Sequence, residues 1–549
     1  MINTQHNPTG LSVLTTTHSA PYQGDPLAVY QLLCHEHSNN ILLESAEIDK
    51  KHLLKSLLLT NAAVKIVCHG NQVTFHALTT NGNLVLDFAK AQLQDKATLS
   101  ASEDNKTFTA TFPAIPDELD EMSRLKATNP FESLRLFQRV ENQQHHPFSV
   151  FLGGAFAFDM MSVAETLPHV NDGENTCPDF VYYLAETLVV IDHELESTEI
   201  ITNSFIKEDE QASEDINRAA KERIHAIATK LATPITSTCE FNNNIAQQSD
   251  NVTTDISDEA FCEIVEQLKE NIRAGDIFQV VPSRTFSLPC VDSILSYQAL
   301  KLSNPSPYMF YLKDEDFCIF GASPESAIKY QQDNRQVEIY PIAGTRPRGF
   351  NAQGEISLDL DSRIELELRQ DKKESAEHIM LVDLARNDIA RVSQAGTRYV
   401  ADLLKVDRYS HVMHLVSRVC GTLLTDLDAL HAYQACMNMG TLSGAPKVKA
   451  TSLIREVEGK RRGSYGGAVG YVTGQGDMDT CIVIRSAFVK DNIAQIQAGA
   501  GVVYDSDPQS EANETRQKAQ AVISAIARAN QAIHGKKISR LAQDISEEK

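Results

Sequence analysis

Four glutamates stand out because their spacing places them in pairs on single faces of predicted helices. Glu374 and Glu377 lie three residues apart in a segment whose helical composition extends through Leu384, and residues three apart share a helix face. The same stripe continues into Leu381 and Leu384. The two carboxylates are therefore predicted to point inward.

A second pair, Glu511 and Glu514, shares a face with Lys518, and that face continues into Val522 and Ile526. Isolated buried carboxylates destabilise a fold. A hard divalent cation bound through oxygen offsets that cost, and Mg²⁺ suits a few carboxylates with room left for a substrate oxygen. The alternative is that the glutamates are solvated residues near helix N-termini, where acids are common. Spacing alone leaves both interpretations open.

A candidate anion receptor lies nearby in the sequence. Gly499, Ala500 and Gly501 follow a predicted strand and precede the second glutamate helix. Small residues there let backbone N–H groups approach an anion closely, although a tight strand crossing explains them equally well. Arg485, alone in an apolar run, lies on the outer face of a strand or receives a planar carboxylate. Tyr465 is expected either to donate a hydrogen bond to the same anion or to pack within the core.

Apolar periodicity predicts the elements that must position these residues. A helix is predicted from an N-cap at Ser257 to a stop at Gly275. Residues 480–489 and 493–498 are predicted to form a hairpin, and residues 53–59 part of a short helix. Strand-rich blocks separated by helices indicate an α+β fold with an antiparallel sheet. Further strand-like runs lie at residues 150–158, 278–281, 317–320 and 337–342.

One composition shift suggests a domain boundary. Residues 233–257 are polar and rich in Asn, Ser and Thr, which is typical of a linker or surface loop. We therefore expect an N-terminal domain over residues 1–235, a linker or loop over 236–257 and a catalytic domain over 258–530. Residues 531–549 are expected to be a frayed, charged C-terminal tail.

Composition excludes several classes of function. The net charge of −23 in 549 residues argues against binding nucleic acid, whose affinity depends on Lys and Arg. The N-terminus lacks a signal-peptide pattern, and no stretch approaches the roughly 20 apolar residues of a membrane span. The ten cysteines are scattered without CxxC spacing, as expected of free thiols in a reducing cytoplasm. A cytoplasmic protein with no membrane partner is predicted.

Several motifs, in this order, resemble the chorismate-utilising enzymes, and among them the large subunits of anthranilate synthases of the enteric bacterial type. The resemblance implies a fold of large antiparallel β-sheets sandwiched by helices. It covers about residues 258–525 densely, and residues 42–45 and 129–131 extend it upstream. The motifs are residues 275–284, 321–326, 341–349, 436–440, 441–447 and 499–518.

The resemblance implies a role for each candidate residue. Mg²⁺ would be held by Glu374, Glu377, Glu511 and Glu514 and would hold the ring carboxylate of chorismate. The remaining candidates are implied to contact the two carboxylates of chorismate, one on the ring and one on the enolpyruvyl group. The ring carboxylate would contact Thr345, Lys518 and the Gly501 N–H, and the enolpyruvyl carboxylate would contact Arg485, Tyr465 and the backbone of Gly499, Ala500 and Gly501. Gly344 is expected to bind the substrate as well.

The implied reaction joins ammonia to chorismate at C2 as the C4 hydroxyl leaves, giving 2-amino-2-deoxyisochorismate, and then eliminates pyruvate to form anthranilate. Glu325 is the candidate acid for the departing hydroxyl. His414 is the candidate base for the C2 proton, although its local sequence equally allows a structural role. Thr345 is counted among both the catalytic and the substrate-binding residues.

Two positions bear on the choice of nucleophile within the resemblance. Family members that add water carry a lysine where this chain has Gln279. The 4-amino-4-deoxychorismate synthases, the nearest alternative, typically carry a lysine where this chain has Ala343. Free ammonia is then the expected nucleophile. None of the cysteines lies in a Gly-x-Cys-x-Gly setting, so a separate glutamine amidotransferase small subunit is implied, in a complex with two copies of each chain.

Two further segments match the family's tryptophan site. Leu43, Glu44 and Ser45 form one part, and Pro307, Tyr308 and Met309 form the other. Ordinary turn structure is the alternative, because Pro-rich tetrapeptides are most often loops. Feedback inhibition by tryptophan is the expectation. A catalytically inactive, tryptophan-binding regulator on the same fold is the alternative from a different functional class.

Overall fold

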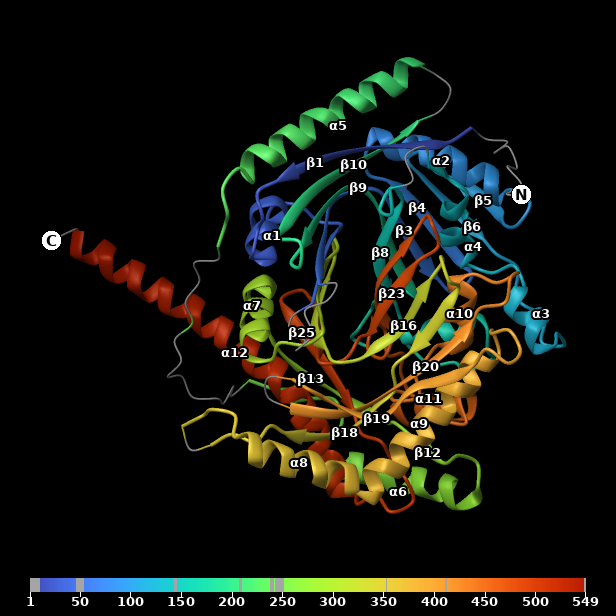
Figure 1. Cartoon of the computed structure of the whole chain (residues 1–549), viewed down its shortest axis with the longest axis vertical. Coiled ribbons are helices and arrows are strands. Elements are labelled where there is room, and N and C mark those ends of the chain that lie inside the picture. Colours follow the sequence, from blue (N-terminus) through green and yellow to red (C-terminus); the bar gives the residue numbers. More distant parts are fainter. Residues whose placement is uncertain are drawn as a thin grey trace.

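The computed structural model describes residues 10–45, 54–142, 146–206, 210–236, 241, 251–351, 353–409 and 412–547, with the backbone alone described for 210–213 and 534–547. In these residues, 23 strands form one continuous network and two more, β12 (Gln279–Val280) and β21 (Gly444–Ala445), form a separate ribbon. The pairings divide the network into two antiparallel sheets. Helices pack around them (Figure 1).

The first sheet contains strands from both ends of the chain. Its neighbouring strands pair antiparallel throughout, and β7 (Glu141–Asn142) adds a short parallel pairing to its first strand. In spatial order they are β1 (Ser12–Ala20), β10 (Ser197–Ile206), β9 (Phe180–Asp192), β3 (Lys55–His69), β2 (Asn40–Glu44), β14 (Tyr308–Lys313), β15 (Cys318–Ser323), β24 (Ser486–Lys490), β25 (Ile493–Gly499), β13 (Ser283–Pro289) and β11 (Thr253–Thr254).

The second sheet uses β3 and β9 again, so this one ladder belongs to both sheets. β3 pairs with β2 near Leu58 and with β4 beyond Val64, and its length of 15 residues makes both pairings possible. In spatial order the sheet contains β5 (Thr98–Ala101), β6 (Thr107–Thr111), β4 (Gln72–Ala77), β3, β9, β8 (Phe151–Phe156), β22 (Ala468–Thr473), β23 (Met478–Ile482), β16 (Ser326–Gln331), β17 (Gln336–Ile339) and β20 (Val412–Thr422), with β18 (Ile342–Pro347) and β19 (Tyr399–Arg408) also paired to β20.

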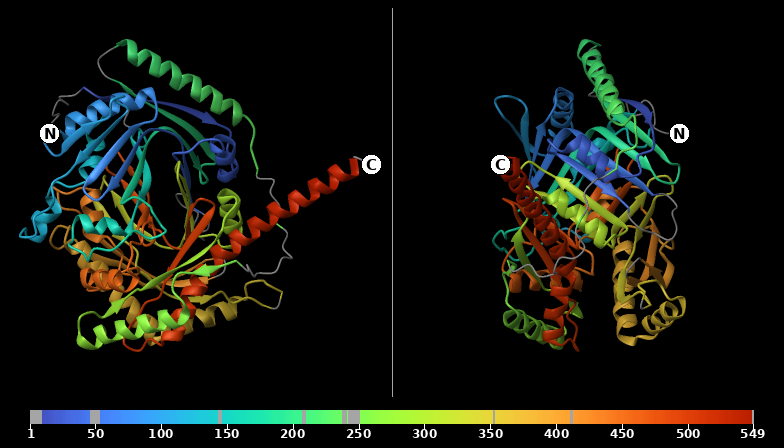
Figure 2. Two further views of the ribbon diagram at one scale, coloured as in Figure 1. Left: turned by 180° about the vertical axis from the view of Figure 1, so that it is seen from behind. Right: turned by 90° about the vertical axis from the view of Figure 1, so that its left-hand side faces the viewer.

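The helices cover the outer faces of the sheets. α9 packs on β18 and β20, while α12 packs on α6, α7 and β25, and the last part of α12 extends away from the rest of the molecule (Figures 1 and 2). The helices are α1 (Pro26–Cys34), α2 (Thr80–Leu93), α3 (Glu121–Lys126), α4 (Glu132–Arg135), α5 (Glu210–Lys230), α6 (Asp258–Ala274), α7 (Ser293–Ser303), α8 (Leu358–Gln370), α9 (Lys372–Ala390), α10 (Ala429–Cys436), α11 (Lys447–Glu458) and α12 (Pro508–Glu547), with 3₁₀ turns at η1 (Leu136–Arg139) and η2 (Phe158–Val163).

The two halves of the chain share these sheets. β2 pairs with β14 and β8 pairs with β22, so strands from before residue 236 lie between strands from after it. The N-terminal part therefore folds into the same sheets as the catalytic part. The predicted linker contains β11, while residues 237–240 and 242–250 of it lie outside the described residues.

The predicted α+β fold with large antiparallel sheets covered by helices is confirmed. The helix after Ser257 is α6, whose N-cap oxygen accepts the Ala260 N–H and whose C-cap, Gly275, has a φ of 83°. The hairpin is β24–β25, with Asp491 and Asn492 in the left-handed region at its turn. No helix in the described part of the chain is both long and apolar enough to cross a membrane.

Four local predictions differ from the structure. Residues 55–59 begin the strand β3 and are not helical, because both faces of this leucine-rich run are buried between other strands; residue 53 lies outside the described residues. The run 480–489 is interrupted between β23 and β24, where Arg485 has a φ of 50°. The run 337–342 is likewise divided between β17 and β18. Finally, α12 continues to Glu547 where a frayed tail was expected.

Candidate active site

The two glutamate helices begin beside the same cavity. Asp371 caps α9 by accepting the Glu374 N–H, and Asp507 caps the start of α12 by accepting the Ser510 N–H at 2.8 Å. These caps fix the first turns, from which Glu374 and Glu511 project. Both helices then turn their apolar residues into the core, as Val522 and Leu381 are buried.

A cavity of about 780 Å³ collects nearly all of the predicted site residues. Its walls come from β18, β20, α9, α12, the interruption between β23 and β24, and the segment after β25. One cavity therefore contains both the carboxylate cluster and the candidate anion receptor. The predicted residues that line it are Glu325, Gly344, Thr345, Glu374, Glu377, His414, Tyr465, Arg485, Gly499, Gly501, Glu511, Glu514 and Lys518.

The carboxylates raise one another's affinity for protons. Burial, together with smaller contributions from the charges of Glu374, Glu514 and Glu511, raises the pKa of Glu377 to about 7. Burial also raises the pKa of Glu511, with Glu514 adding to the effect. A cluster of this kind holds excess negative charge that a cation would neutralise.

Basic side chains already lie within ion-pair distance of three of these glutamates, the longest distance being 3.9 Å between Lys373 and Glu377. Arg346 donates to Glu374 at 2.9 Å, and Lys518 lies 2.6 Å from Glu514. In the part of the chain that the structure describes, no three His, Cys, Asp or Glu side chains are close enough to share an ion. Glutamate side chains have several rotatable bonds, so the four carboxylates can converge from this arrangement through rotamer changes.

Another part of the cavity wall is suited to an anion. The positive φ of Arg485 turns its backbone out of the strand direction and its guanidinium lines the cavity. Among the described residues, no carboxylate forms an ion pair with it. A Cβ added to Gly499 would lie 3.1 Å from the Tyr465 hydroxyl, and one on Gly501 would lie 2.8 Å from the Gln279 amide nitrogen. A side chain at either position would therefore crowd the groups that line the cavity.

The structure differs from the prediction at Ala500. Its N–H donates to the Pro282 carbonyl at 3.1 Å, and its side chain is buried away from the cavity. A strand-to-strand hydrogen bond occupies the group that was predicted to bind the anion. Gly499 and Gly501, on either side, line the cavity in its place.

Glu325 lies buried at the turn between β15 and β16. Its backbone N–H donates to Ser323, and Thr441 donates to its carboxyl group at 3.1 Å. Burial raises the pKa of Glu325 to about 8, against the opposing influence of Thr441. This carboxyl group is therefore protonated at neutral pH and can act as a general acid.

His414 has the opposite character. Burial, with a smaller contribution from Arg485, lowers the pKa of His414 to about 4, so its imidazole is neutral at physiological pH. A bulge in β18 between Ala343 and Thr345 places the Thr345 hydroxyl 2.9 Å from the His414 Nδ1. The hydroxyl orients the ring, as a residue working as a base requires.

Sequence reasoning missed two partners of the predicted residues. Thr441, which binds Glu325, begins a motif that had been noted without a role for this hydroxyl. Arg346 holds Glu374 and, at 2.7 Å, Asp371. Only the motifs containing them signalled their importance, because both contacts join segments that are distant along the chain.

A second cavity, of about 670 Å³, contains the predicted effector residues. The pairing of Glu44 on β2 with Met309 on β14 brings the two segments together. Lys301 donates to the Glu44 carboxylate at 2.5 Å, and the Tyr308 hydroxyl donates to Asp479 at 3.3 Å. Leu43, Glu44, Ser45, Pro307, Tyr308 and Met309 all line this cavity.

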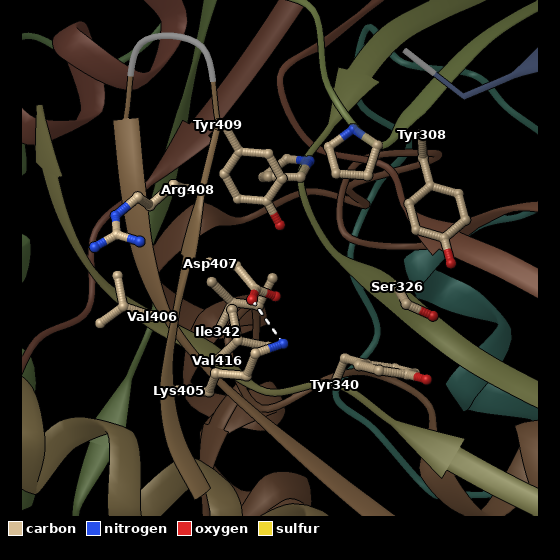
Figure 3. A pocket seen from close by; sticks show the side chains of 12 residues that line it. Tyr308, Ser326, Tyr340, Ile342, Lys405, Val406, Asp407, Arg408, Tyr409 and Val416 are labelled. Atoms are coloured by element: carbon tan, nitrogen blue, oxygen red, sulfur yellow. Dashed lines mark ion pairs between the residues drawn. The ribbon is translucent and has the colours of Figure 1, made fainter. Parts of the chain in front are cut away.

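A third cavity, of about 410 Å³, lies between the other two. It shares Tyr308 with the effector cavity and Ile342 with the catalytic cavity. Figure 3 shows Tyr308 on one side and the ion pair of Lys405 with Asp407, 3.1 Å apart, on another. The third cavity therefore borders both predicted sites.

Sequence comparison places this arrangement in a known group. The profile of the family described as chorismate binding enzyme matches residues 88–524. The chain belongs to the chorismate binding enzyme family. This chorismate binding enzyme is 58% identical to anthranilate synthase component 1 of Vibrio cholerae over 514 residues, covering 93% of this chain and 96% of that protein.

Two further relatives agree. Anthranilate synthase component 1 of Escherichia coli is 52% identical over 516 residues, covering 93% of this chorismate binding enzyme and 96% of that protein. The crystal structure of anthranilate synthase component I from Streptococcus pneumoniae superposes with a TM-score of 0.65 at 29% identity, covering 91% of this chain and 98% of that one.

Proposed function

We propose that this chain is the large subunit of an anthranilate synthase, which converts chorismate and ammonia to anthranilate and pyruvate. The observation that carries the proposal is one cavity lined both by four glutamates and by Arg485, whose guanidinium forms no ion pair with a carboxylate among the described residues. Chorismate carries two carboxylates, so one can face the glutamates through a cation while the other binds Arg485. The names of the relatives support the same assignment.

Mg²⁺ is part of the proposal. Glu374, Glu377, Glu511 and Glu514 would hold it, and a cation would offset the burial and the mutual repulsion that raise the pKa of Glu377. When bound, Mg²⁺ supplies Lewis-acid stabilisation of charge that develops on the ring carboxylate. Lys518 and Thr345 would make further contacts with that carboxylate from the same cavity.

The chain's own residues can supply both proton transfers. The protonated Glu325 gives its proton to the C4 hydroxyl as ammonia adds at C2, so that water leaves and 2-amino-2-deoxyisochorismate forms. The neutral His414 then takes the C2 proton as pyruvate leaves. An imidazole with a pKa of about 4 is a weak base, but aromatisation of the ring drives this step.

The identity of the nucleophile follows from two uncharged residues. Gln279 and Ala343 both line the cavity, and neither side chain can activate water or attack C2 covalently. Ammonia is therefore the proposed nucleophile, delivered by a glutamine amidotransferase subunit in a complex with two copies of each chain. The cytoplasmic location remains part of the same proposal.

Tryptophan is the proposed feedback inhibitor, bound in the cavity lined by Ser45 and Met309. The third cavity borders both this site and the catalytic one, sharing Tyr308 with the first and Ile342 with the second. Inhibition requires that tryptophan bind the active and inactive arrangements with different affinities.

Turnover of chorismate with an ammonium salt tests the proposal. We expect fluorescent anthranilate and one equivalent of pyruvate, and we expect EDTA to abolish both until Mg²⁺ is added. Formation of an aminated product without pyruvate would instead indicate a 4-amino-4-deoxychorismate synthase. Tryptophan binding with no chorismate consumption would indicate an inactive regulator.

A further inference from the structure

A buried arginine lies next to the wall of the catalytic cavity. Arg462 is 1% exposed, although arginine is almost never fully buried unless it is paired. It belongs to the loop between α11 and β22, three residues before Tyr465, which lines the cavity. Because its own side chain is buried, Arg462 can act on a substrate only through its neighbours.

All three nitrogen atoms of the Arg462 guanidinium donate hydrogen bonds. Two of them bind the carboxylate of Glu458, at the end of α11, with Nε at 2.9 Å and Nη2 at 2.5 Å. Nη1 donates to the Leu442 carbonyl at 2.8 Å, and Nη2 also donates to the Val281 carbonyl at 2.7 Å. Only the planar fork of an arginine can reach all of these acceptors at once.

These acceptors belong to segments that form the cavity wall. Leu442 lines the cavity and follows Thr441, whose hydroxyl binds the candidate acid. Val281 follows β12, which begins at Gln279, another wall residue. Arg462 therefore joins two parts of the wall that are distant along the chain.

Glu458 extends the same network to a third part of the wall. Its side chain is 2% exposed. Its carboxylate accepts both the N–H and the hydroxyl of Ser283, each at 2.8 Å. The Ser283 hydroxyl in turn accepts the Gln497 amide at 2.8 Å, and Gln497 lines the cavity. The pair thus connects the end of α11 with the β13–β25 ladder.

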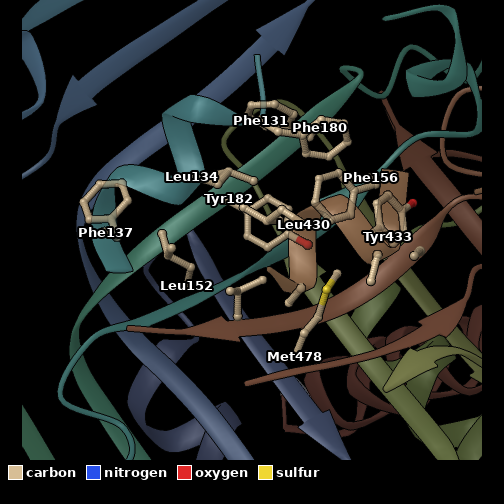
Figure 4. Packing of buried hydrophobic residues seen from close by; sticks show 14 of the residues in the cluster. Phe131, Leu134, Phe137, Leu152, Phe156, Phe180, Tyr182, Leu430, Tyr433 and Met478 are labelled. Carbon is tan, nitrogen blue, oxygen red and sulfur yellow. The ribbon is translucent and has the colours of Figure 1, made fainter. Parts of the chain in front are cut away.

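The guanidinium also lies over two aromatic rings. The central carbon of Arg462 is 4.5 Å from the ring centroid of Phe158 and 5.5 Å from that of Tyr465, and a cation is attracted to such ring faces. Phe158 directly follows β8, whose Phe156 stacks on Tyr433 in the hydrophobic core with ring centroids 4.3 Å apart (Figure 4). Arg462 therefore connects Tyr465 with a segment anchored in the core.

The charge of Arg462 acts on the Tyr465 hydroxyl as well. Burial raises the pKa of Tyr465 to about 12, and Arg462 is the largest influence that opposes this rise, ahead of Arg485. The hydroxyl therefore keeps its proton at neutral pH, and the nearby cation polarises it. Both properties suit a hydrogen-bond donor to a carboxylate.

We infer that Arg462 and Glu458 form a positioning pair for chorismate, which holds Tyr465 where its hydroxyl can donate to the enolpyruvyl carboxylate. The inference rests on the proposed function, and neither member of the pair touches the substrate. A hydrogen bond to this carboxylate is made equally in the ground state and the transition state. Its loss should therefore raise KM for chorismate and leave kcat nearly unchanged.

Arg462→Lys tests the pair, because it keeps the positive charge and loses the planar fork. With ammonium salt and Mg²⁺, we expect KM for chorismate to rise about tenfold, the value of one hydrogen bond to a charged group. Tyr465→Phe should raise KM by a similar factor. The double variant should show no further rise, since both changes remove the same contact.

Arg135→Lys is the matched control. Arg135 is also buried and also pairs with two carboxylates, those of Asp428 and Glu132, but it lies outside the wall of the catalytic cavity. We expect this variant to melt at a lower temperature than the parent and to keep the parent's KM. A rise in its KM equal to that of Arg462→Lys would show that any lost buried pair has this effect, and would overturn the inference.

An unchanged KM in Arg462→Lys would also overturn it, as would increases in KM that multiply when Arg462→Lys and Tyr465→Phe are combined. Glu458→Gln is the second variant, which preserves the arginine and the shape of its partner. It must give the same rise in KM and the same lack of additivity with Tyr465→Phe. A parent that makes no anthranilate from chorismate would overturn the proposed function itself, and this role with it.

Discussion

At the scale of residues, Glu325 and His414 titrate on opposite sides of neutral pH although both line one cavity. Burial penalises the charged form of each group, so it raises the pKa of the acid to about 8 and lowers that of the base to about 4. At pH 7 both are uncharged. Each is thus in the protonation state that its proposed step requires.

Replacing Glu325 tests the acid. Glu325→Gln keeps the shape of the side chain but cannot release a proton, and general acid catalysis contributes about 100-fold or more, so we expect kcat to fall by about that factor. In the parent, kcat should decline as the pH rises through about 8, where the carboxyl group ionises. A pH–rate profile of the variant that retained this alkaline decline would contradict the assignment.

Ala343 tests the choice of nucleophile. Ala343→Lys introduces an amine into the cavity beside the bulge of β18. We expect anthranilate formation, followed by fluorescence, to fall about tenfold or more, because the amine competes for C2 and its charge disturbs the carboxylate site. Ala343→Leu, similar in bulk but uncharged, separates the two effects. Unchanged turnover in the lysine variant would count against this position.

Much of the site could be predicted at this scale. The spacing of Glu374 with Glu377 and of Glu511 with Glu514 placed each pair on one helix face, but it left open whether the carboxylates are solvated, and the resemblance to a known family favoured the inward orientation. The role of Arg485 could not be decided from the sequence. It depends on a positive φ that interrupts an apolar run, and no periodic pattern in the sequence predicts such a break. The contact of Thr441 with Glu325 joins two loops and was equally invisible to local patterns.

At the scale of elements, the start of α12 is positioned by one buried arginine. Arg284 on β13 donates to the Ala512 carbonyl at 2.8 Å and to the Thr515 hydroxyl at 2.9 Å. It also pairs with Asp258 at the start of α6. These contacts fix the turn that carries Glu511 and Glu514, so β13 sets the direction of the carboxylates.

Arg284→Met should loosen that turn. Several buried acceptors would lose their donor, which costs about 3 kcal/mol in stability, and we expect a lower melting temperature. We also expect the Mg²⁺ concentration for half-maximal activity to rise about tenfold, by analogy with outer partners of metal ligands. Arg516→Met, which removes an exposed partner of the same Asp258, is the control. An Arg284→Met variant with a lower melting temperature but the Mg²⁺ requirement of the parent would contradict the positioning role of Arg284.

Elements with caps and periodic apolar residues were predictable, and strands buried on both faces were not. α6 was found from Ser257 and Gly275. By contrast, the leucines at the start of β3 gave no alternation, because both faces of this strand are covered by other parts of the chain. A short apolar run of this kind resembles a buried helix. Only the neighbouring strands, which are distant in sequence, decide between the two.

At the scale of the whole molecule, the effector and catalytic cavities share a third cavity as a common boundary. β14 carries Tyr308 in the effector wall, and its partner β15 leads directly to Glu325 through the pairing of Tyr308 with Ser323. A ligand that displaces β14 therefore acts on the strand that positions the acid. The sequence could not predict this adjacency, because it arises from the order of strands in the first sheet.

Tryptophan and chorismate should weaken each other's binding by the same factor, as linkage demands. The chain contains no tryptophan, so the fluorescence of the bound effector reports its binding directly. We expect saturating chorismate, without ammonia, to raise the dissociation constant of tryptophan about tenfold. Ser45→Leu should remove the binding signal, whereas Ser100→Leu, at an exposed position, should retain it. Equal tryptophan affinity with and without chorismate would contradict the coupling.

The ladder shared by β3 and β9 also governs how this chain is made. Both strands leave the ribosome early, yet β2 must wait for β14 and β8 must wait for β22 before their free edges are covered. Such long-range pairing slows folding and leaves unpaired edges exposed to other chains. The edges of β2 and β8 therefore stay uncovered during synthesis until β14 and β22 have been made.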